Sequence, residues 1–209
     1  EIITRLLDIA NQSSGNSEAN AWHRIRLNLS QTTFYTPVYI NGIILRQELD
    51  LSNSIFLENL RIEDTRLNSL NWEGAELRSQ TIISKSKLQF NTFPSYIKLA
   101  HFSKTTFSAG PQSIDSLEII LPFNSQITTD EPIEEILFDD NCTFQHKLKM
   151  HGCTLTRPSM ISFKNCIFGP VEITGTLRSL ITFDQCQFGD VVNIHDIDYQ
   201  MGHSSSPDE

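Results

Sequence analysis

Several features are absent from this chain of 209 residues, and each absence excludes a class of protein. No apolar run approaches the roughly 18 residues of a membrane-spanning helix, and no segment resembles a signal peptide. The sequence also has no Gly-rich phosphate loop, nucleophile elbow or paired-His helix motif, which are short signatures of common enzyme classes. It therefore predicts no membrane span and no catalytic, cofactor-binding or metal-binding residues.

Basic residues are scarce as well: 16 Lys and Arg stand against 25 Asp and Glu, for a net charge of −9. Proteins that bind nucleic acids depend on Lys and Arg to neutralise phosphates, so the balance argues against direct binding to DNA or RNA. An acidic surface suits solubility or a basic protein partner.

What the chain does contain is repetition. Residues 161–171 recur as residues 181–191, with Ile, Phe, Cys, Phe and Val in the same places and free variation between them. Self-similarity at such a fixed spacing is typical of stacked repeat architectures. The repeated unit therefore predicts a type of fold rather than an activity.

Within this unit, pairs of apolar residues separated by one residue advance in steps of five. A helix would need steps of three and four, and a β-sandwich would show strict alternation, so the pattern fits very short strands joined at corners. The C-terminal tract comprises Ile161, Cys166, Val171, Thr176, Ile181, Cys186 and Val191, with Phe163, Phe168, Ile173, Arg178, Phe183 and Phe188 as partners.

Two further tracts keep the five-residue step and are expected to face inward. With 13 Phe and only 9 Gly in the chain, we expect aromatic side chains to stack at the inter-strand spacing of about 4.8 Å. The tracts are Leu60, Thr65, Leu70 and Ala75 with Ile62, Leu67, Trp72 and Leu77, extended by Ile55 and Leu57, and earlier Leu29, Phe34, Tyr39, Ile44 and Leu49 with Leu27, Thr32, Pro37, Gly42 and Gln47.

The pattern resembles the pentapeptide-repeat family, over residues 27–82 and 161–193. The resemblance rests on a central Leu or Phe with a small residue two positions before it, and it diverges because the family's usual Asp or Asn is mostly replaced. It implies an all-β solenoid, a right-handed parallel β-helix with four pentapeptides per turn. The central residues are Leu67, Leu77, Phe163, Phe168, Phe183 and Phe188, and the small ones are Thr65, Ala75, Cys166 and Cys186.

The organisation along the chain follows from composition. Residues 1–12 are expected to form a short amphipathic helix that caps the solenoid, because unpaired strand edges at the open ends need covering. Residues 13–201 are expected to form the β-helix, with an irregular, loop-bearing middle at about 83–135, punctuated by prolines. Residues 202–209 are expected to be a disordered tail or linker. The first residue is Glu1 rather than Met, so we expect an excised fragment or a processed product.

All four cysteines lie in the last third of the chain, and they offer two hypotheses. Cys166 and Cys186 occupy equivalent inward positions, where we expect free, buried thiols and hence a reducing compartment. Cys142, His146, His151 and Cys153 lie within a dozen residues, but their spacing matches no common structural zinc pattern, so we expect no zinc site.

Carboxylates near the repeats raise the possibility of glycoside chemistry, which requires two of them at a defined separation. The sequence does not define such a pair, and outward positions of a solenoid normally carry solvated charges. The two tryptophans, Trp22 and Trp72, are expected to pack in the core. The acidic residues concerned are Asp139, Asp140, Asp184, Asp190, Asp196 and Asp198.

Three functions are compatible with these observations. The first is a non-catalytic interaction or scaffold module that binds protein partners, including host proteins, through the region 83–135 and its outer faces. Its organisation is similar to the β-helix domain of bacterial effectors such as the HECT-like ubiquitin ligases, which implies a substrate-binding role in the cytoplasm or in the host cytosol. The alternatives are an acidic, DNA-mimicking gyrase-binding protein and a carbohydrate-active β-helix. The oligomeric state is left open.

Overall fold

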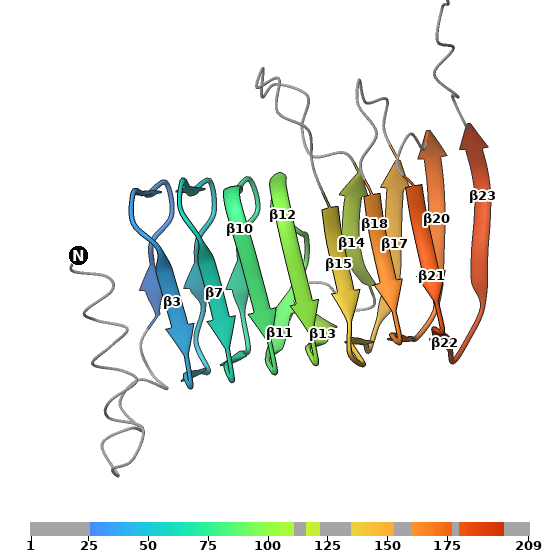
Figure 1. Ribbon diagram of the computed structural model, residues 1–209, viewed down its shortest axis with the longest axis horizontal. Coiled ribbons are helices and arrows are strands. Elements are labelled where there is room, and N and C mark those ends of the chain that lie inside the picture. Colours follow the sequence, from blue (N-terminus) through green and yellow to red (C-terminus); the bar gives the residue numbers. More distant parts are fainter. Residues whose placement is uncertain (1–25, 111–115, 122–134, 153–159, 177–179, 199–209) are drawn as a thin grey trace, which may run out of the picture.

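The protein is an all-β parallel solenoid, as a computed structural model shows for residues 26–110, 116–121, 135–152, 160–176 and 180–198 (Figure 1). Consecutive coils stack along one axis, and every pairing between the described strands is parallel. The described residues contain no helix, and therefore none that could span a membrane. The parallel β-helix predicted from the repeats is confirmed.

One sheet, here called sheet C, contains one strand from each successive coil, so its strands give the number of coils. It has seven strands, so six turns separate the first from the last. The coils differ in length: Arg66 lies beside Ile44, Thr143 beside Thr106 and Gln187 beside Ile167, so these turns take 22, 37 and 20 residues. The strands of sheet C are β4 (Ile44–Leu45), β8 (Arg66–Leu67), β11 (Lys87–Phe90), β13 (Thr106–Ala109), β16 (Thr143–Phe144), β19 (Ile167–Phe168) and β22 (Gln187–Phe188).

Sheet B is the largest and lies before sheet C in every coil. In the first two coils it consists of two short strands per coil, and β10 then pairs with both strands of the preceding coil, so two short faces merge into one. Its strands are β2 (Thr33–Phe34), β3 (Val38–Asn41), β6 (Ile55–Phe56), β7 (Leu60–Glu63), β10 (Glu76–Ser84), β12 (Tyr96–Ser103), β15 (Glu135–Asp139), β18 (Met160–Lys164) and β21 (Leu180–Asp184).

The remaining face is built differently at the two ends. The N-terminal coils close it with the short strands of sheet A, and the C-terminal coils close it with the longer strands of sheet D. The cross-section therefore changes from four short strands per coil to three longer ones along the stack. Sheet A contains β1 (Leu27–Asn28), β5 (Leu49–Asp50) and β9 (Leu70–Asn71), and sheet D contains β14 (Ser116–Leu121), β17 (Lys147–Gly152), β20 (Val171–Thr176) and β23 (Val192–Asp198).

The corners explain why a small residue precedes each central apolar residue. At the corner between sheets B and C, a residue with positive φ, such as Asp64 (48°) or Asn165 (53°), turns the chain, and at one corner two do so, Asp140 and Asn141. The next residue points into the corner, where Ile43 stands in the first coil and small side chains stand in the later ones. These small residues are Thr65, Ser86, Thr105, Cys142, Cys166 and Cys186.

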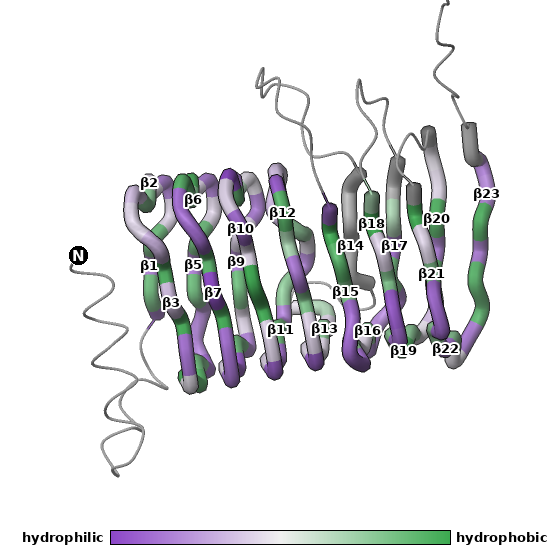
Figure 2. Tube along the Cα trace, viewed as in Figure 1, coloured by the Kyte–Doolittle hydropathy of each residue, from purple (hydrophilic) through white to green (hydrophobic). Residues whose placement is uncertain are grey.

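Stacked phenylalanines fill the interior of the C-terminal half, as expected for parallel coils. Phe138 lies between Phe102 and Phe163, with ring centroids 4.6 and 4.8 Å apart. A second column runs through Phe144 and Phe168, 4.9 Å apart. The tube view shows the resulting alternation of hydrophobic and hydrophilic residues along the strands (Figure 2).

The predicted inward positions are right in the tract from Leu60 to Leu77, all eight of which are buried, and from Ile161 to Ile173. In the first tract Phe34 and Leu49 are buried as predicted, but the prediction is wrong at Tyr39 and Ile44, which are exposed. The reason is the longer turn, because a five-residue step stays in register only when a turn holds four pentapeptides, and the turn from Ile44 to Arg66 holds more. The same shift of the pattern by one residue applies at Phe56, which is buried, whereas Ile55 and Leu57, which were predicted to face inward, are only half-buried. The side chains that face inward in the first coil are Phe34, Val38, Ile40, Ile43 and Leu45.

Two predicted elements fall outside the described residues. They are the capping helix at 1–12, with Trp22 after it, and the tail at 202–209. The domain boundaries drawn from the sequence therefore stay predictions. Within the region 83–135, the described strands β11 to β14 belong to sheets B, C and D like their neighbours.

Candidate functional site

The last coil leaves apolar side chains uncovered, and we refer to its surface as the open end. The outermost strands of sheets B, C and D are β21, β22 and β23, and no described strand pairs with their outer edges. Phe188 is 39% exposed, Val192 41%, Val191 58% and Ile194 63%. Large apolar side chains at this exposure, grouped on one coil, are typical of an interaction surface.

The first coil also exposes apolar side chains, Tyr35, Tyr39 and Ile44, but it differs from the open end in its inward positions. Its inward side chains Phe34, Val38 and Leu45 are buried, although the coil lies at the other extreme of sheets B and C. Val191 and Phe188 were expected to face inward on the repeat pattern, yet both are exposed. The cause is position in the stack, since no described coil lies beyond them.

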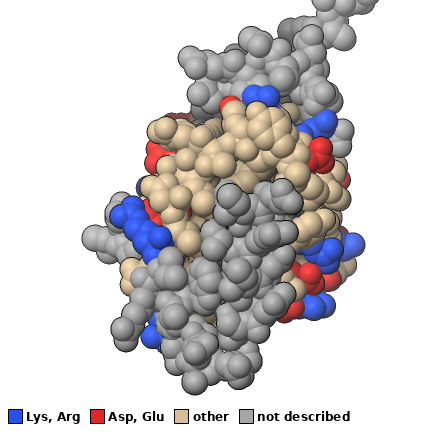
Figure 3. Space-filling view, turned by 90° about the vertical axis from the view of Figure 1, so that its left-hand side faces the viewer, with Lys and Arg blue, Asp and Glu red and all other residues tan. Residues whose placement is uncertain are grey.

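The charge of the open end is of one sign. Residues 180–196 contain Asp184, Asp190 and Asp196 but no Lys or Arg, so the segment carries three negative charges with His195 neutral. All three carboxylates are exposed. The space-filling view of the opposite end of the solenoid shows both signs of charge around uncharged residues (Figure 3).

Elsewhere in the C-terminal half, unlike charges lie next to each other on consecutive coils. Lys147 forms an ion pair with Glu172, and this ammonium group holds the pKa of the Glu172 carboxyl below its usual value. Lys164 lies beside Asp184 in the register of β18 and β21. The carboxylates of the last coil have no such neighbour on their outer side among the described residues.

A second irregularity is a hollow of about 220 Å³ at the point where sheet A ends. Its polar groups are mainly hydrogen-bond acceptors from carboxylates and carboxamides, and Trp72 closes its apolar side. The indole Nε1 of Trp72 donates a 2.8 Å hydrogen bond to the carbonyl of Thr92. The lining residues include Glu48, Asn71, Glu73, Gln89, Asn91 and Thr92.

The hollow lies where a column of Asx turns stops. Asn28, Asp50 and Asn71 are stacked in sheet A, and each side chain accepts the backbone N–H two residues further on. Asn91 comes one turn after Asn71, but its buried Oδ1 accepts no hydrogen bond from the described residues. The buried Phe93 beyond it packs against Phe90, so the local chain does not repeat the turn.

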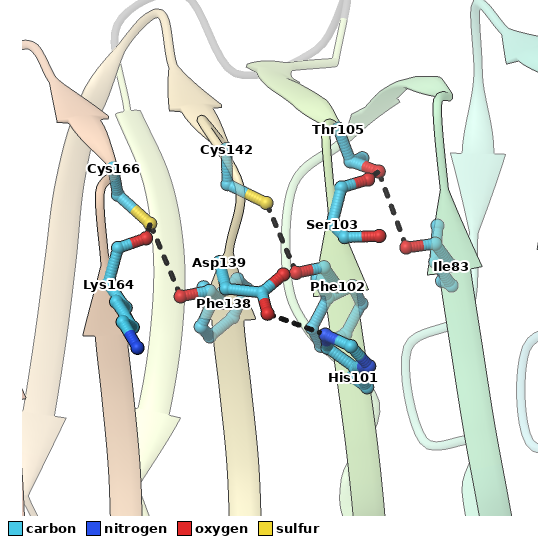
Figure 4. Close-up of polar contacts among 10 residues, drawn as sticks. All are labelled: Ile83, His101, Phe102, Ser103, Thr105, Phe138, Asp139, Cys142, Lys164 and Cys166. Atoms are coloured by element: carbon cyan, nitrogen blue, oxygen red, sulfur yellow. Dashed lines mark hydrogen bonds and ion pairs between the residues drawn. The ribbon is translucent and has the colours of Figure 1, made fainter.

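Three cysteines stack in the corner between sheets B and C: Cys142 and Cys166, which are buried and drawn in Figure 4, and Cys186, which is half-buried. Cys142 Sγ donates to the carbonyl of Phe102 (3.3 Å), and Cys166 Sγ donates to that of Phe138 (3.4 Å). Thr105 Oγ1 makes the equivalent bond to the carbonyl of Ile83 one coil earlier. The thiols are free, as predicted, and they occupy a position that hydroxyls fill in the upstream coils.

Two of these thiols have raised pKa values. A hydrogen bond with Cys142, together with burial, raises the pKa of Cys166 far above its usual value. Burial raises the pKa of Cys186. Nucleophilic thiols have lowered pKa values, so both shifts run opposite to those of reactive cysteines.

We expect the triple variant Cys142→Thr, Cys166→Thr, Cys186→Thr to fold, with an unfolding free energy within about 2 kcal/mol of the parent, because Thr already fills this corner at Thr65 and Thr105. The raised thiol pKa values stabilise the parent fully below the ordinary thiol pKa, and this contribution is lost as pH rises above about 9. Denaturant titrations of both proteins from pH 7 to pH 10 measure it. Cys166→Leu is the matched control and should destabilise more through overpacking; equal stability of Leu and Thr variants would contradict the assigned corner.

The four residues considered for zinc are not gathered into one described site. Cys142 points to the Phe102 carbonyl, whereas His146 accepts a hydrogen bond from the Ala109 N–H through Nδ1 (3.1 Å). The side chain of His151 and the whole of Cys153 fall outside the described part of the chain. No group of three potential ligands occurs among the residues that the structure describes.

The carboxylates considered for glycoside chemistry lie apart in the register. Asp139 is 3.0 Å from His101 Nε2 on the outer face of sheet B, and its Oδ1 is buried without a hydrogen-bond partner among the described residues. Asp140, Asp184 and Asp190 are exposed, and Asp196 lies 2.8 Å from Nδ1 of His195. The side chain of Asp198 is not described. In these contacts a carboxylate lies beside a histidine ring rather than facing a second carboxylate.

Comparison of the chain with protein-family models, with curated proteins and with solved structures finds no match, so no family is assigned. Sequence reasoning missed both irregular surfaces. The open end could have been predicted from one feature of the sequence, which is the absence of Lys and Arg after Arg178. The hollow could have been predicted from another, which is that an Asn recurs at Asn91, one repeat length after Asn71.

Proposed function

We propose that this chain is a non-catalytic protein–protein interaction or scaffold module, and that its open end is the binding surface. One observation carries the proposal: Phe188, Val191, Val192 and Ile194 are exposed together, in a solenoid whose other coils bury their inward side chains. Repeated side chains form the interior, so binding chemistry must lie where the repetition ends. The surface was expected at 83–135, and the exposed apolar residues support the C-terminal coil instead.

We also propose that the fold is a divergent, right-handed member of the pentapeptide-repeat type. The support is the corner geometry, in which a small residue such as Thr65 or Cys166 precedes a buried Leu67 or Phe168 by two positions. The unequal lengths of the coils are the divergence.

The proposed setting is that of a bacterial effector module, in which a β-helix binds substrate proteins for a ubiquitin ligase in the host cytosol. Support comes from the free, stacked thiols, since such thiols persist in a reducing compartment. The bacterial cytoplasm is also a reducing compartment, so the free thiols are equally compatible with a location there.

The proposal is tested by comparing partners of the parent, of Ile194→Asp and of Tyr35→Ser in bacterial and animal-cell extracts. Tyr35 is 74% exposed in the first coil and is the matched control. Chemical cross-linking with quantitative mass spectrometry should show partners that Ile194→Asp loses at least tenfold and that Tyr35→Ser retains. Partners that none of the variants changes, or the absence of any reproducible partner, would overturn the proposed surface.

A further inference from the structure

We infer that the open end binds a β-strand of a partner protein that is apolar on one face and carries Lys or Arg on the other, and that this strand adds to the free edge of β23. The inference rests on the proposed function and names the chemistry of the partner.

The free edge of β23 is suited to strand addition. At seven residues, β23 is longer than the other outermost strands, β21 and β22, and among the described strands it pairs with β20 on its inner side only. Its register is regular from Val192 to Ile194 and shifts before Ile197, where Asp196 has a φ of 52°, so the regular edge is the first part of the strand. Backbone N–H and C=O groups along such an edge are a ready template for another strand. Figures 1 and 2 show β23 at the outer limit of the stack, with hydrophobic and hydrophilic residues alternating along it.

The side chains of β23 specify the pattern of the added strand. Val192 continues the column of Leu148 and Val171, and Ile194 continues that of Met150 and Ile173. The four inner members are buried, whereas Val192 and Ile194 are exposed for want of a neighbour. A strand with apolar residues at alternate positions would extend both columns by one layer, because side chains in register share a face.

The charges specify the other face of the added strand. Lys149 lies beside Glu172 in sheet D, and Lys164 lies beside Asp184 in sheet B, so neighbouring coils pair unlike charges. The last coil presents Asp184, Asp190 and Asp196 with no Lys or Arg between residues 180 and 196. In sheet D the column of Lys149 and Glu172 continues with the uncharged Asn193, so Lys or Arg on the added strand would be attracted by the net negative charge of the last coil rather than by a carboxylate in register.

A second copy of this chain matches the surface less well. Its open end would bring the same three aspartates against their counterparts, and like charges across an interface oppose association. Its first coil, at the other end, buries its inward side chains, and the exposed Tyr39 and Ile44 each stand between two buried neighbours, so they continue no inward column. The basic partner strand is therefore the occupant that the surface favours.

The test uses fluorescent synthetic peptides with the sequence Lys-Val-Lys-Ile-Lys-Val-Lys, its Glu-for-Lys counterpart, and a Lys peptide of the same composition with its apolar residues adjacent. Fluorescence anisotropy at low salt should show the alternating Lys peptide binding at least tenfold tighter than either control, and weakening in about 150 mM salt. Ile194→Asp should abolish the preference for the alternating pattern, and Tyr35→Ser should leave it unchanged. Hydrogen exchange should show new protection of β23 amides.

Equal binding of the Glu peptide, or of the peptide with adjacent apolar residues, would overturn the inference. So would a concentration-dependent dimer that Ile194→Asp dissociates, since a second copy would then occupy the edge. If cross-linked partners depend on Ile194 but the alternating Lys peptide fails to bind, the inference alone is wrong. If neither depends on Ile194, the proposed function fails with it.

Discussion

Replacement of Phe168 by Asp is expected to unfold the coils around it. Phe168 is 2% exposed and stacks between Phe144 and Phe188, at 4.9 and 5.1 Å. Loss of a buried ring alone costs about 3–5 kcal/mol, and an unpaired carboxylate in its place adds a desolvation penalty. The sum is comparable with the whole stability of a domain, about 5–15 kcal/mol. Hydrogen exchange should show lost protection of the amides in β19 and its neighbours, β16 and β22.

The matched control is Phe188→Asp, one coil further in the same column. Phe188 is 39% exposed, so a carboxylate there can reach water, and the cost should stay below about 2 kcal/mol. Protection of β16 and β19 should survive in this variant. Equal loss of protection in both variants would mean that the stack continues beyond the last coil and that the open end is covered.

Replacement of Trp72 by Ala is expected to lower the unfolding free energy by about 3–5 kcal/mol, the usual cost of removing a large buried aromatic side chain. Trp72 is buried where sheet A ends, and its ring lies 5.0 Å from Phe90 and 6.1 Å from Phe93. Its Nε1 also donates to the carbonyl of Thr92, so one side chain joins the four-stranded coils to the three-stranded ones. Denaturant titration followed by circular dichroism measures the loss.

Trp72→Phe separates the two contributions of this side chain. It keeps most of the packing but removes the hydrogen bond to Thr92, so its cost should be about 1–2 kcal/mol. A loss as large as that of Trp72→Ala would show that the hydrogen bond, rather than the ring, holds the junction together.

The open end and the hollow share an origin. Each lies where a column of equivalent residues has no further described member: the columns of Val192 and Ile194 end at the last coil, and the Asx column ends at Asn71. In a solenoid, each coil packs against its neighbours along the axis, so a column that stops leaves its last member without its usual neighbour. Both candidate surfaces lie at such interruptions, whereas Thr81 Oγ1 and Asp139 Oδ1 are buried within sheet B without a hydrogen-bond partner among the described residues.

The inward positions of the later coils could be read from the sequence, because Phe163, Cys166 and Phe168 recur unchanged in type at Phe183, Cys186 and Phe188. The first coil could not be read in this way. Its longer turn displaces the pattern, so that Tyr39 points outward and Val38 points inward, and apolar residues at both positions hide the displacement.

The sequence by itself determined that the chain is a parallel β-solenoid, because a step of five with small residues at corners has no helical or sandwich solution. It also determined the chemistry of the interior and the deficit of basic residues. Only the tertiary structure decided where the repetition stops: where sheet A gives way to sheet D, and which apolar side chains have no described coil above them. Exposure depends on the neighbour along the axis, and that neighbour lies a whole turn away in the chain, as Gln187 does from Ile167, beyond the reach of any local pattern.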